Sequence, residues 1–468
     1  MTITNDGLAE GEDPFRELDP RNAEPAAEIP FDEEMPGLLP EEFWKEREIF
    51  QHIRDAAHAR LCSGDVAFWA TMARLSGMVS HKVRAETLIG DPASLNLFVA
   101  VVGPPGAGKS TSAAISRRLM DGPEDFLDGL PIGTGQGMCE IFMGEVEEDT
   151  GRCIERGPNR GDPVMTKVRK QVAHNAYFYV DEGGVLGKQG SGDTSVLYET
   201  IRSAAVGGTI GQTNASADRR RRIEADSYSM GMLIGFQPVT ALPLLADWGT
   251  GTPQRFIWSW VIDPHIPRKR PAHPGKITGH LGAWRPTADV LIAFPPDICQ
   301  MLEDDLRERR SNPNTEETSE DLDGHAGLIK VKVAALLAIL DKRMQVTDDD
   351  WRIAEMLWAN SCLVRDSLAA RAKRESEAAR KAAEDAAVSV ATRIHEATAG
   401  ADRKLESLAV LIRQHVGNAG IAGITWGAVR KLFASRDRPL LEKAIEIAVA
   451  KGWVVEIEER FHVPVADA

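Results

Sequence analysis

The chain has 468 residues, of which 43% are apolar and 27% charged, so two or three domains are expected and a single compact one is excluded. The 55 lysines and arginines face 70 aspartates and glutamates, a formal net charge of −15. Nucleic-acid binding would therefore need local basic patches, and a polybasic coating role is excluded. The five cysteines form no CxxC pair, which argues against a zinc ribbon or a disulfide framework.

The sequence predicts no targeting or membrane segment. Its first residues lack a basic start followed by an apolar stretch, and no run of about 18 apolar residues occurs. We therefore expect a cytoplasmic protein without membrane contact.

The N-terminal part divides into two segments. Residues 1–40 hold eleven acids and two arginines, a net charge of 2 − 11 = −9, and show no apolar periodicity, which predicts a disordered acidic tail. Residues 41–84 have apolar side chains at roughly helical spacing with a break near Ser63-Gly64, which predicts two N-terminal helices.

The central part reads as an α/β domain. Apolar runs of strand length, separated by helix-sized stretches, predict strands buried on both faces of a mostly parallel sheet. These runs are 95–102, 177–180, 230–236 and 256–261, and they define a predicted core at residues 85–265.

The C-terminal part is predicted to be mostly helical. Thr347 and Asp350 have the spacing of a capping box that starts a helix, and acids in that first turn, Asp348 to Asp350, are better explained by the helix dipole than by a metal. The predicted segments are a linker and irregular region at 266–325, a helical module at 326–370, a helical linker at 371–402 and a winged helix-turn-helix at 403–468.

The strongest motif is GPPGAGKS, which fits the pattern GxxxxGK[ST] after an apolar strand and before a helix. Glycines allow backbone N–H groups to curl around phosphates, and the helix N-terminus adds partial positive charge. Lys109 would neutralise the β- and γ-phosphates of ATP, and Ser110 would hold Mg²⁺; the alternative is a plain glycine turn. The predicted nucleotide-binding residues are Gly103, Pro104, Pro105, Gly106, Ala107, Gly108, Lys109, Ser110 and Thr111.

Two acids follow the apolar run at 177–180. Asp181 is expected to coordinate Mg²⁺ through water. Glu182 would polarise the attacking water, as a general base does in an ATPase that turns over. The alternative is an acidic surface pair. The predicted catalytic residues are Glu182, Lys109, Gln237 and Arg255, and the predicted metal ligands are Ser110 and Asp181.

Two further polar residues flank predicted strands. Gln237 follows the run at 230–236, at the edge where ligands bind in open α/β sheets, and is a candidate sensor or a hydrogen-bonded strand end. Arg255 directly precedes the run at 256–261. It is a candidate arginine finger for the γ-phosphate in its own or a neighbouring subunit, or a structural salt bridge.

Basic residues in two places are candidate nucleic-acid contacts. The first is the run Arg219, Arg220, Arg221 and Arg222, which either grips single-stranded DNA or is a solvated loop. The second is Arg438, at the start of the expected recognition helix at 438–450. Thr425 is expected to cap the helix that precedes it. Glu442 and Glu446 weaken a base-reading role for that helix, so DNA or RNA contact and protein contact both stay open. The GTGQG stretch at 133–137 reads as a turn before a helix.

Several of these blocks together resemble a known family. They are LPEEFWKEREIFQHI, SLNLFVAVVGPPGAGKST, LPIGTGQG, FYVDE, GTPQRFIW and KVAALLAILDKRMQVTDDDW, spread over roughly residues 38–370. They resemble P-loop proteins of bacteria, phages and integrated elements that look like the helicase half of primase-helicases without a primase half. The resemblance implies an oligomeric, ring-forming ATPase in the replication of a mobile element, with possible replication proteins as partners. The glycine-rich VDEGGVLGKQGSG departs from the pattern.

Other functions for the same loop fit less well. A small-molecule kinase has little use for the C-terminal modules, no NKxD motif supports a GTPase, and no LSGGQ-like signature supports a transporter ATPase. The main alternative to a helicase is an ATP-dependent DNA-binding switch or helicase loader that does not unwind. A transcriptional regulator with a slow ATPase is a third possibility.

Overall fold

The computed structural model describes residues 35–156, 158–186, 192–212, 221–247, 250–311 and 325–464. The chain divides into two compact units, Met1–Ala372 and Lys373–Ala468. Most of the predicted acidic tail lies outside the described residues, but its last part is packed. Trp260 Nε1 donates to the Pro36 carbonyl at 2.9 Å, and the Leu39 N–H donates to Asp65 at 3.0 Å. The predicted disordered tail therefore does not extend to residue 40, because residues 35–40 are apolar and uncharged.

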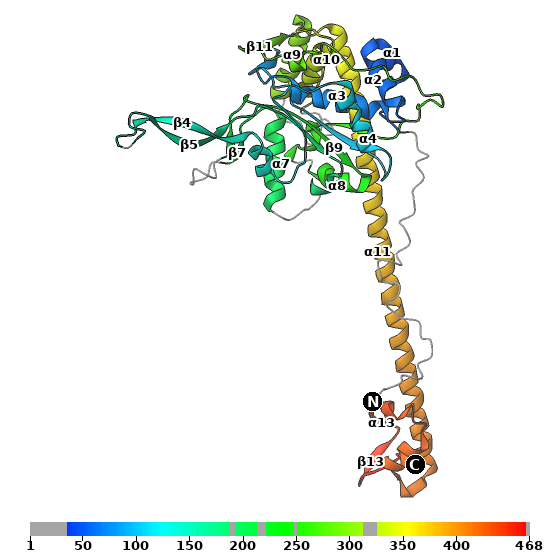
Figure 1. Cartoon of the computed structure of the whole chain (residues 1–468). Helices are drawn as coiled ribbons and strands as arrows, with labels where there is room; N and C mark the ends of the chain where they lie inside the picture. Colours follow the sequence, from blue (N-terminus) through cyan, green and yellow to red (C-terminus); the bar gives the residue numbers. More distant parts are fainter. Residues whose placement is uncertain are drawn as a thin grey trace, which may run out of the picture. The chain divides into compact units, whose positions relative to one another are not determined.

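A five-stranded parallel sheet forms the centre of the first unit (Figure 1). The four predicted strands are present, which confirms the α/β core with its mostly parallel sheet. The fifth strand was not predicted because Asp128 and Gly129 interrupt its short apolar run. In spatial order the strands are β10 (Phe256–Trp260), β2 (Leu97–Val102), β9 (Ser229–Phe236), β6 (Asn175–Val180) and β3 (Phe126–Leu130).

Both faces of this sheet are buried. Leu97, Val99 and Val101 of β2 join one hydrophobic core, whereas Phe98, Ala100 and Val102 join a second core on the other face. Every residue of β2, β9 and β10 is buried. Burial on both faces explains why these strands read as continuous apolar runs.

Helix α3 (Gly64–Met78) lies across one face of the sheet, and all of its residues are buried. A Cβ at Gly77 would lie 2.3 Å from the Ala176 carbonyl oxygen, and one at Gly231 would lie 1.8 Å from the Ala73 carbonyl oxygen. The two glycines therefore allow this close helix–sheet approach. Before α3 lie α1 (Glu41–Glu46) and α2 (Glu48–His58), so the segment contains three helices where two were predicted.

Besides Val364 and Leu368 of the long C-terminal helix, three shorter helices contribute to the second core. They are α6 (Gly135–Glu140), α7 (Gly192–Ala205) and α8 (Pro238–Ala246). Met138 from α6, Ile201 from α7 and Leu244 from α8 are all buried there.

The predicted linker at 266–325 contains regular structure, and that prediction was wrong in this respect. Strand β11 (Val290–Ala293) pairs in parallel with β1 (Val83–Glu86), and α9 (Pro296–Ser311) follows. The sequence did not predict β11 because a four-residue apolar run is too short to indicate a strand. The two predicted helices around the capping box are present as α10 (Ala326–Leu340) and α11 (Asp348–Asn418).

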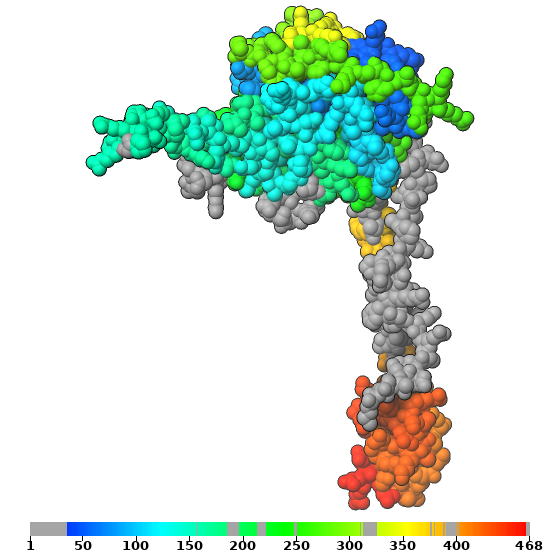
Figure 2. All heavy atoms as spheres, in the orientation of Figure 1, coloured from blue at the N-terminus to red at the C-terminus, as the bar shows by residue number. Residues whose placement is uncertain are grey.

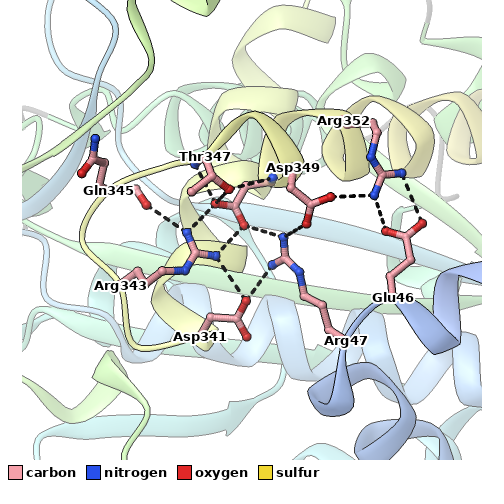
Figure 3. Close-up of polar contacts among 9 residues, drawn as sticks. Glu46, Arg47, Asp341, Arg343, Gln345, Thr347, Asp349 and Arg352 are labelled. Atoms are coloured by element: carbon pink, nitrogen blue, oxygen red, sulfur yellow. Dashed lines mark hydrogen bonds and ion pairs between the residues drawn. The ribbon is translucent and has the colours of Figure 1, made fainter.

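A polar network joins the first turn of α11 to the N-terminal helices (Figure 3). Asp350 is fully buried; it accepts from Arg343 at 2.6 and 2.7 Å and from the Thr347 N–H at 2.8 Å. Arg47, between α1 and α2, lies 2.8 Å from both Asp341 and Asp350. The Asp350 N–H also donates to Thr347 Oγ1 at 3.3 Å, which confirms the predicted capping box. The acids of this turn thus serve the helix cap and ion pairs.

Two antiparallel hairpins extend from the first unit. The longer one, β4 (Met143–Cys153) with β5 (Pro163–Gln171), projects away from the central sheet (Figures 1 and 2). The shorter one pairs β7 (Ile210–Gln212) with β8 (Arg221–Ile223). Neither hairpin was predicted: the strands of the longer one carry many charged residues in place of apolar runs, and those of the shorter one are only three residues long.

The second unit has its own core, built from the end of α11, α12 (Trp426–Leu432), α13 (Leu441–Ala450) and a small antiparallel sheet. That sheet has the order β12 (Ile424–Thr425), β14 (Arg460–His462) and β13 (Val455–Ile457). Among the described helices, none combines the length and apolar character needed to cross a membrane.

Candidate functional site

The glycine-rich loop at 103–108 connects β2 to α4 (Lys109–Ala113), at the carboxyl-terminal edge of the sheet. Gly106 and Gly108 have φ values of +76° and +86°, a region that favours glycine. A Cβ at Gly106 would meet nothing within 4 Å, so this part of the loop faces open space. The Gly103 N–H donates to the Phe236 carbonyl at 3.0 Å, which ties the start of the loop to β9.

Lys109 lies over this loop. Its Nζ donates to the carbonyl oxygens of Gly103 and Pro104 at 3.0 and 2.9 Å. An ammonium group has three N–H donors, so one remains for a ligand. Burial lowers the pKa of Lys109 below its ordinary value. The charges of Asp181 and Glu182 raise it, but by less than burial lowers it. A Cβ at Gly235 would lie 2.5 Å from the Asp181 carbonyl oxygen and 3.3 Å from Lys109 Cδ, so the structure brings Lys109 near Asp181.

Asp181 and Glu182 follow directly after β6, at the same edge of the sheet and both exposed. Tyr179 donates its hydroxyl to Asp181 Oδ1 at 2.9 Å. Gly183 follows in a 3₁₀ turn, η2 (Gly183–Leu186), where a Cβ would lie 2.1 Å from the Phe236 ring. A glycine is thus needed directly after Glu182, which gives a packing reason for part of the glycine-rich stretch that follows this acid.

Gln237 lies between the loop and the acid pair because β9 separates β2 from β6. Its Nε2 donates to Glu182 Oε1 at 3.0 Å, and its backbone N–H donates to Thr240 Oγ1 at 2.9 Å. The second bond fixes the start of α8, and the first orients Glu182. The structure therefore brings Gln237 together with Glu182. This is expected, because Gln237 directly follows β9, which lies next to β6 in the sheet.

The oxygen atoms of Ser110 and Asp181 suit a small hard cation such as Mg²⁺, which keeps several waters and takes few protein ligands. Within the described ranges, no three His, Cys, Asp or Glu side chains form a metal-binding group. A cation at this place would therefore also need oxygen atoms from a ligand, as phosphates provide.

Arg255 lies at the opposite edge of the sheet. It ends the 3₁₀ turn η5 (Pro253–Arg255), directly before β10, whose five residues span roughly 17 Å. Its Nη1 donates to the Gly251 carbonyl, and its Nε is buried without a hydrogen-bond partner. Burial and nearby Arg202 lower its pKa, whereas Asp247 raises it. Because Phe256 pairs with Phe98 and Trp260 with Val102, Arg255 and the glycine-rich loop lie at opposite ends of the paired strands β10 and β2.

The candidate nucleic-acid arginines are only partly described. Arg219 and Arg220 lie outside the described residues. Arg221 and Arg222 belong to β8 and are paired with carboxylates: Arg221 with Glu140, and Arg222 with Glu224 at 3.0 Å. These pairs leave less positive charge for phosphates than the sequence indicates.

The expected recognition helix begins later than predicted. Arg438 lies in a 3₁₀ turn, η9 (Arg438–Leu440), and donates from Nε to the Phe433 carbonyl at 3.4 Å. Thr425 occupies the N-cap position of α12 without a side-chain cap bond. The exposed residues of α13 and of the following hairpin include Glu442, Glu446, Val449, Glu456, Ile457, Glu458 and Glu459.

The GTGQG stretch behaves as predicted. Thr134 caps α6 by accepting from the Gly137 N–H at 3.0 Å, so the glycines form a turn before a helix. Beside it, α6, α7 and β7 line a polar cavity of about 120 Å³ that includes Gln136, Thr200 and Gln212.

Sequence reasoning missed Tyr179 and Gly235 at the site. Tyr179 was counted only as an apolar strand residue, although alternation along β6 would have placed it two residues before Asp181 on the same face. A Cβ at Gly235 would lie 2.5 Å from the Asp181 carbonyl oxygen and 3.3 Å from Lys109 Cδ. No signal in the sequence indicates this crowding.

No protein-family model matches the sequence, and a search of curated proteins finds no significant match.

Proposed function

We propose that the chain is a P-loop ATPase that binds ATP with Mg²⁺ and acts on DNA as a helicase- or translocase-like protein in the replication of a mobile element. One observation carries the nucleotide part. Lys109, Gln237 and the pair Asp181 and Glu182 follow three adjacent parallel strands and meet at one edge of the sheet. Ligands bind at this edge in open α/β sheets.

The residues at this edge have distinct roles in the proposed reaction. The backbone of the glycine-rich loop and Lys109 bind the phosphates, and Ser110 with Asp181 hold Mg²⁺, which supplies neutralising charge when bound. Glu182 takes the proton of the attacking water. Gln237 donates to Glu182 Oε1, so Oε2 is left as the acceptor for that proton.

The position of Arg255 supports action between subunits. A half-buried guanidinium at the edge of the sheet opposite the glycine-rich loop is better placed for a phosphate on a neighbouring copy than for one at the loop of its own subunit. This favours the oligomeric ring implied by the family resemblance, in which each Arg255 would complete the site of its neighbour.

The alternative function, an ATP-dependent switch or helicase loader, is favoured by the second unit. We infer a winged helix there from the order of α12, α13 and the β13–β14 hairpin. From α13 through the hairpin the exposed acids outnumber the exposed bases, which are Lys443, Lys451 and Arg460. This acidic excess disfavours DNA phosphates, so the surface suits a replication protein better than a duplex. Bound nucleotide would then control the affinity of the chain for its partner, and hydrolysis would not drive movement along DNA.

Hydrolysis and unwinding assays separate these functions. We expect ATP hydrolysis that single-stranded DNA stimulates, and a larger mass by light scattering with a non-hydrolysable analogue. Displacement of a strand from a forked duplex with ATP supports the helicase; hydrolysis without displacement supports the loader. ATP hydrolysis that persists unchanged in Lys109→Ala would rule out the proposed site.

A further inference from the structure

The segment at 264–276, here called the basic loop, follows β10. Because β10 pairs in parallel with β2, the loop starts from the same edge of the sheet as the glycine-rich loop. It contains no acid and four bases, which are Arg268, Lys269, Arg270 and Lys276. In a chain with a net charge of −15, phosphates are attracted only where bases gather without acids. The basic loop is such a place.

The three consecutive bases at 268–270 are available to a ligand. All three are exposed, and none of them makes a side-chain hydrogen bond or ion pair with another residue in the described part of the chain. Carboxylates contact the basic loop near its two ends. Glu41 lies 3.4 Å from His265 Nδ1. Asp121 lies 2.7 Å from Lys276 Nζ. The bases between these two contacts keep their full charge for a partner.

The basic loop is fixed at both ends. Asp263, directly before it, accepts from His58 Nε2 and from the Gly64 N–H at 2.9 Å each. Ile277, directly after it, donates its N–H to the Leu119 carbonyl at 2.8 Å. Within the loop, φ is restricted at four prolines, which are Pro264, Pro267, Pro271 and Pro274. A restricted backbone loses less conformational entropy when its side chains bind a partner.

The same contacts place the basic loop beside the candidate nucleotide site. A Cβ at Gly103 would lie 2.8 Å from Val261 Cβ, so the chain leaving β10 passes next to the start of the glycine-rich loop. Leu119 ends α5 (Ile115–Leu119), which follows α4 and therefore Lys109. A ligand on the basic loop would thus lie on the side of the sheet where ATP is proposed to bind.

We propose that the basic loop binds the phosphate backbone of single-stranded DNA through Arg268, Lys269 and Arg270. The inference rests on the proposed function, because it names the surface by which the proposed ATPase contacts DNA. The run at 219–222 fits this role less well, since both of its described arginines are paired with carboxylates.

The composition of the basic loop favours a nucleic acid over a protein partner. Protein interfaces are usually anchored by buried aromatic or large apolar side chains. The loop contains no aromatic residue, and Ile266, its one large aliphatic residue, is not exposed. Guanidinium and ammonium groups without such anchors suit phosphate contacts, which carry no sequence information. The loop should therefore bind DNA without base preference.

The test is the salt dependence of binding of a fluorescein-labelled oligo-dT strand to the full chain, followed by anisotropy. Each lost phosphate contact flattens the plot of log affinity against log salt by about 0.7 for a single strand. In the triple variant Arg268→Ala, Lys269→Ala and Arg270→Ala, we expect weaker binding and a slope that is flatter by about 2. Thermal unfolding checks that the variant is folded.

A matched control removes the same charge from other surfaces. Lys167, Lys170 and Arg307 are exposed, but each is paired with a carboxylate. The triple variant Lys167→Ala, Lys170→Ala and Arg307→Ala has the same net charge as the test variant and should keep the wild-type slope.

The outcomes distinguish the inference from the proposed function. A wild-type chain that binds labelled polyglutamate but no DNA strand would refute the DNA part of the proposed function, and the inference with it. Wild-type DNA binding with an unchanged slope in the 268–270 variant would overturn the inference alone, because DNA would then contact another surface. An equal change in the control variant would also overturn it, since the effect would come from net charge.

Discussion

At the scale of single residues, Gly235 lies where the parts of the candidate site meet. The Lys109 side chain passes over it, and the Asp181 carbonyl lies beside it. Because β9 separates β2 from β6, any side chain at this position would enter the space between the lysine and the acids. The absence of a Cβ here is thus as necessary to the site as the charged groups themselves.

Replacing Gly235 by alanine should therefore disturb the site without removing a polar group. The new Cβ would meet backbone at 2.5 Å, and overpacking of this kind costs about 1–3 kcal/mol of stability. We expect weaker ATP binding, measured by calorimetry, and a lower midpoint of urea unfolding. The control is Gly133→Ala, where a Cβ meets nothing within 4 Å; equal effects in both variants would contradict the crowding argument.

Glu182→Gln tests the proposed base. An amide cannot accept the water proton, so turnover should fall by about 10²–10⁴-fold while ATP binding persists. Binding by calorimetry and phosphate release on the same sample give the two quantities. Loss of binding in a folded variant would instead assign Glu182 to holding the nucleotide or the metal.

At the scale of elements, sequence patterns were reliable where one physical cause dominated. Strands β2, β6, β9 and β10 were predictable because burial on both faces demands continuous apolar residues. Strands β3, β4 and β5 were not, because Asp128 interrupts β3 and because cross-strand ion pairs such as Lys170–Glu148 take the place of apolar alternation in the long hairpin. Regular elements in 266–325 were hidden by the prolines and charges around them.

The same reasoning applies to the site. Lys109, Asp181, Glu182 and Gln237 were predictable because each follows a strand, and parallel strands end at one edge. Arg255 precedes its strand, so the sequence already contained the signal that it lies at the other edge. The bond from Tyr179 to Asp181 was predictable only as far as the alternation along β6, which puts both side chains on the same face.

The network at the start of α11 makes a prediction about pH. Burial raises the pKa of Asp350. Hydrogen bonds from Arg343 and Thr347 and the charge of Arg47 together lower it by more than burial raises it, so the pKa lies below the ordinary 3.8. A carboxyl group with a lowered pKa stabilises the folded state above its unfolded pKa and loses that effect as pH falls through the folded value. The contribution should be complete at pH 7 and disappear below pH 3.8.

Removing the Asp350 charge should show this directly. Because Asp350 is the buried partner of Arg47 and Arg343, Asp350→Asn should lower the free energy of unfolding by about 3 kcal/mol at pH 7. Urea denaturation is suitable because it does not screen charges. Asp348→Asn removes an exposed acid from the same turn and should have a small effect. A cost for Asp350→Asn that persists unchanged at pH 3 would contradict the ion-pair explanation.

At the scale of the whole molecule, the account requires assembly. Arg255 and Lys109 lie at opposite edges of one sheet, so one subunit can supply the loop while its neighbour supplies the arginine. Mixing inactive Lys109→Ala with inactive Arg255→Ala should restore part of the ATPase activity, because some interfaces then contain both intact residues. Light scattering would check co-assembly. Co-assembled but inactive mixtures would make Arg255 a structural residue.

The central claim is that the carboxyl-terminal edge of the parallel sheet binds ATP with Mg²⁺. Calorimetric titration of ATP into the wild-type chain and into Lys109→Ala, both with Mg²⁺ and with folding confirmed by circular dichroism, tests it most directly. The account predicts saturable binding to the wild type and little or none to the variant, because the phosphates lose the cation of the loop. Equal binding to both proteins, or none to either, would contradict it.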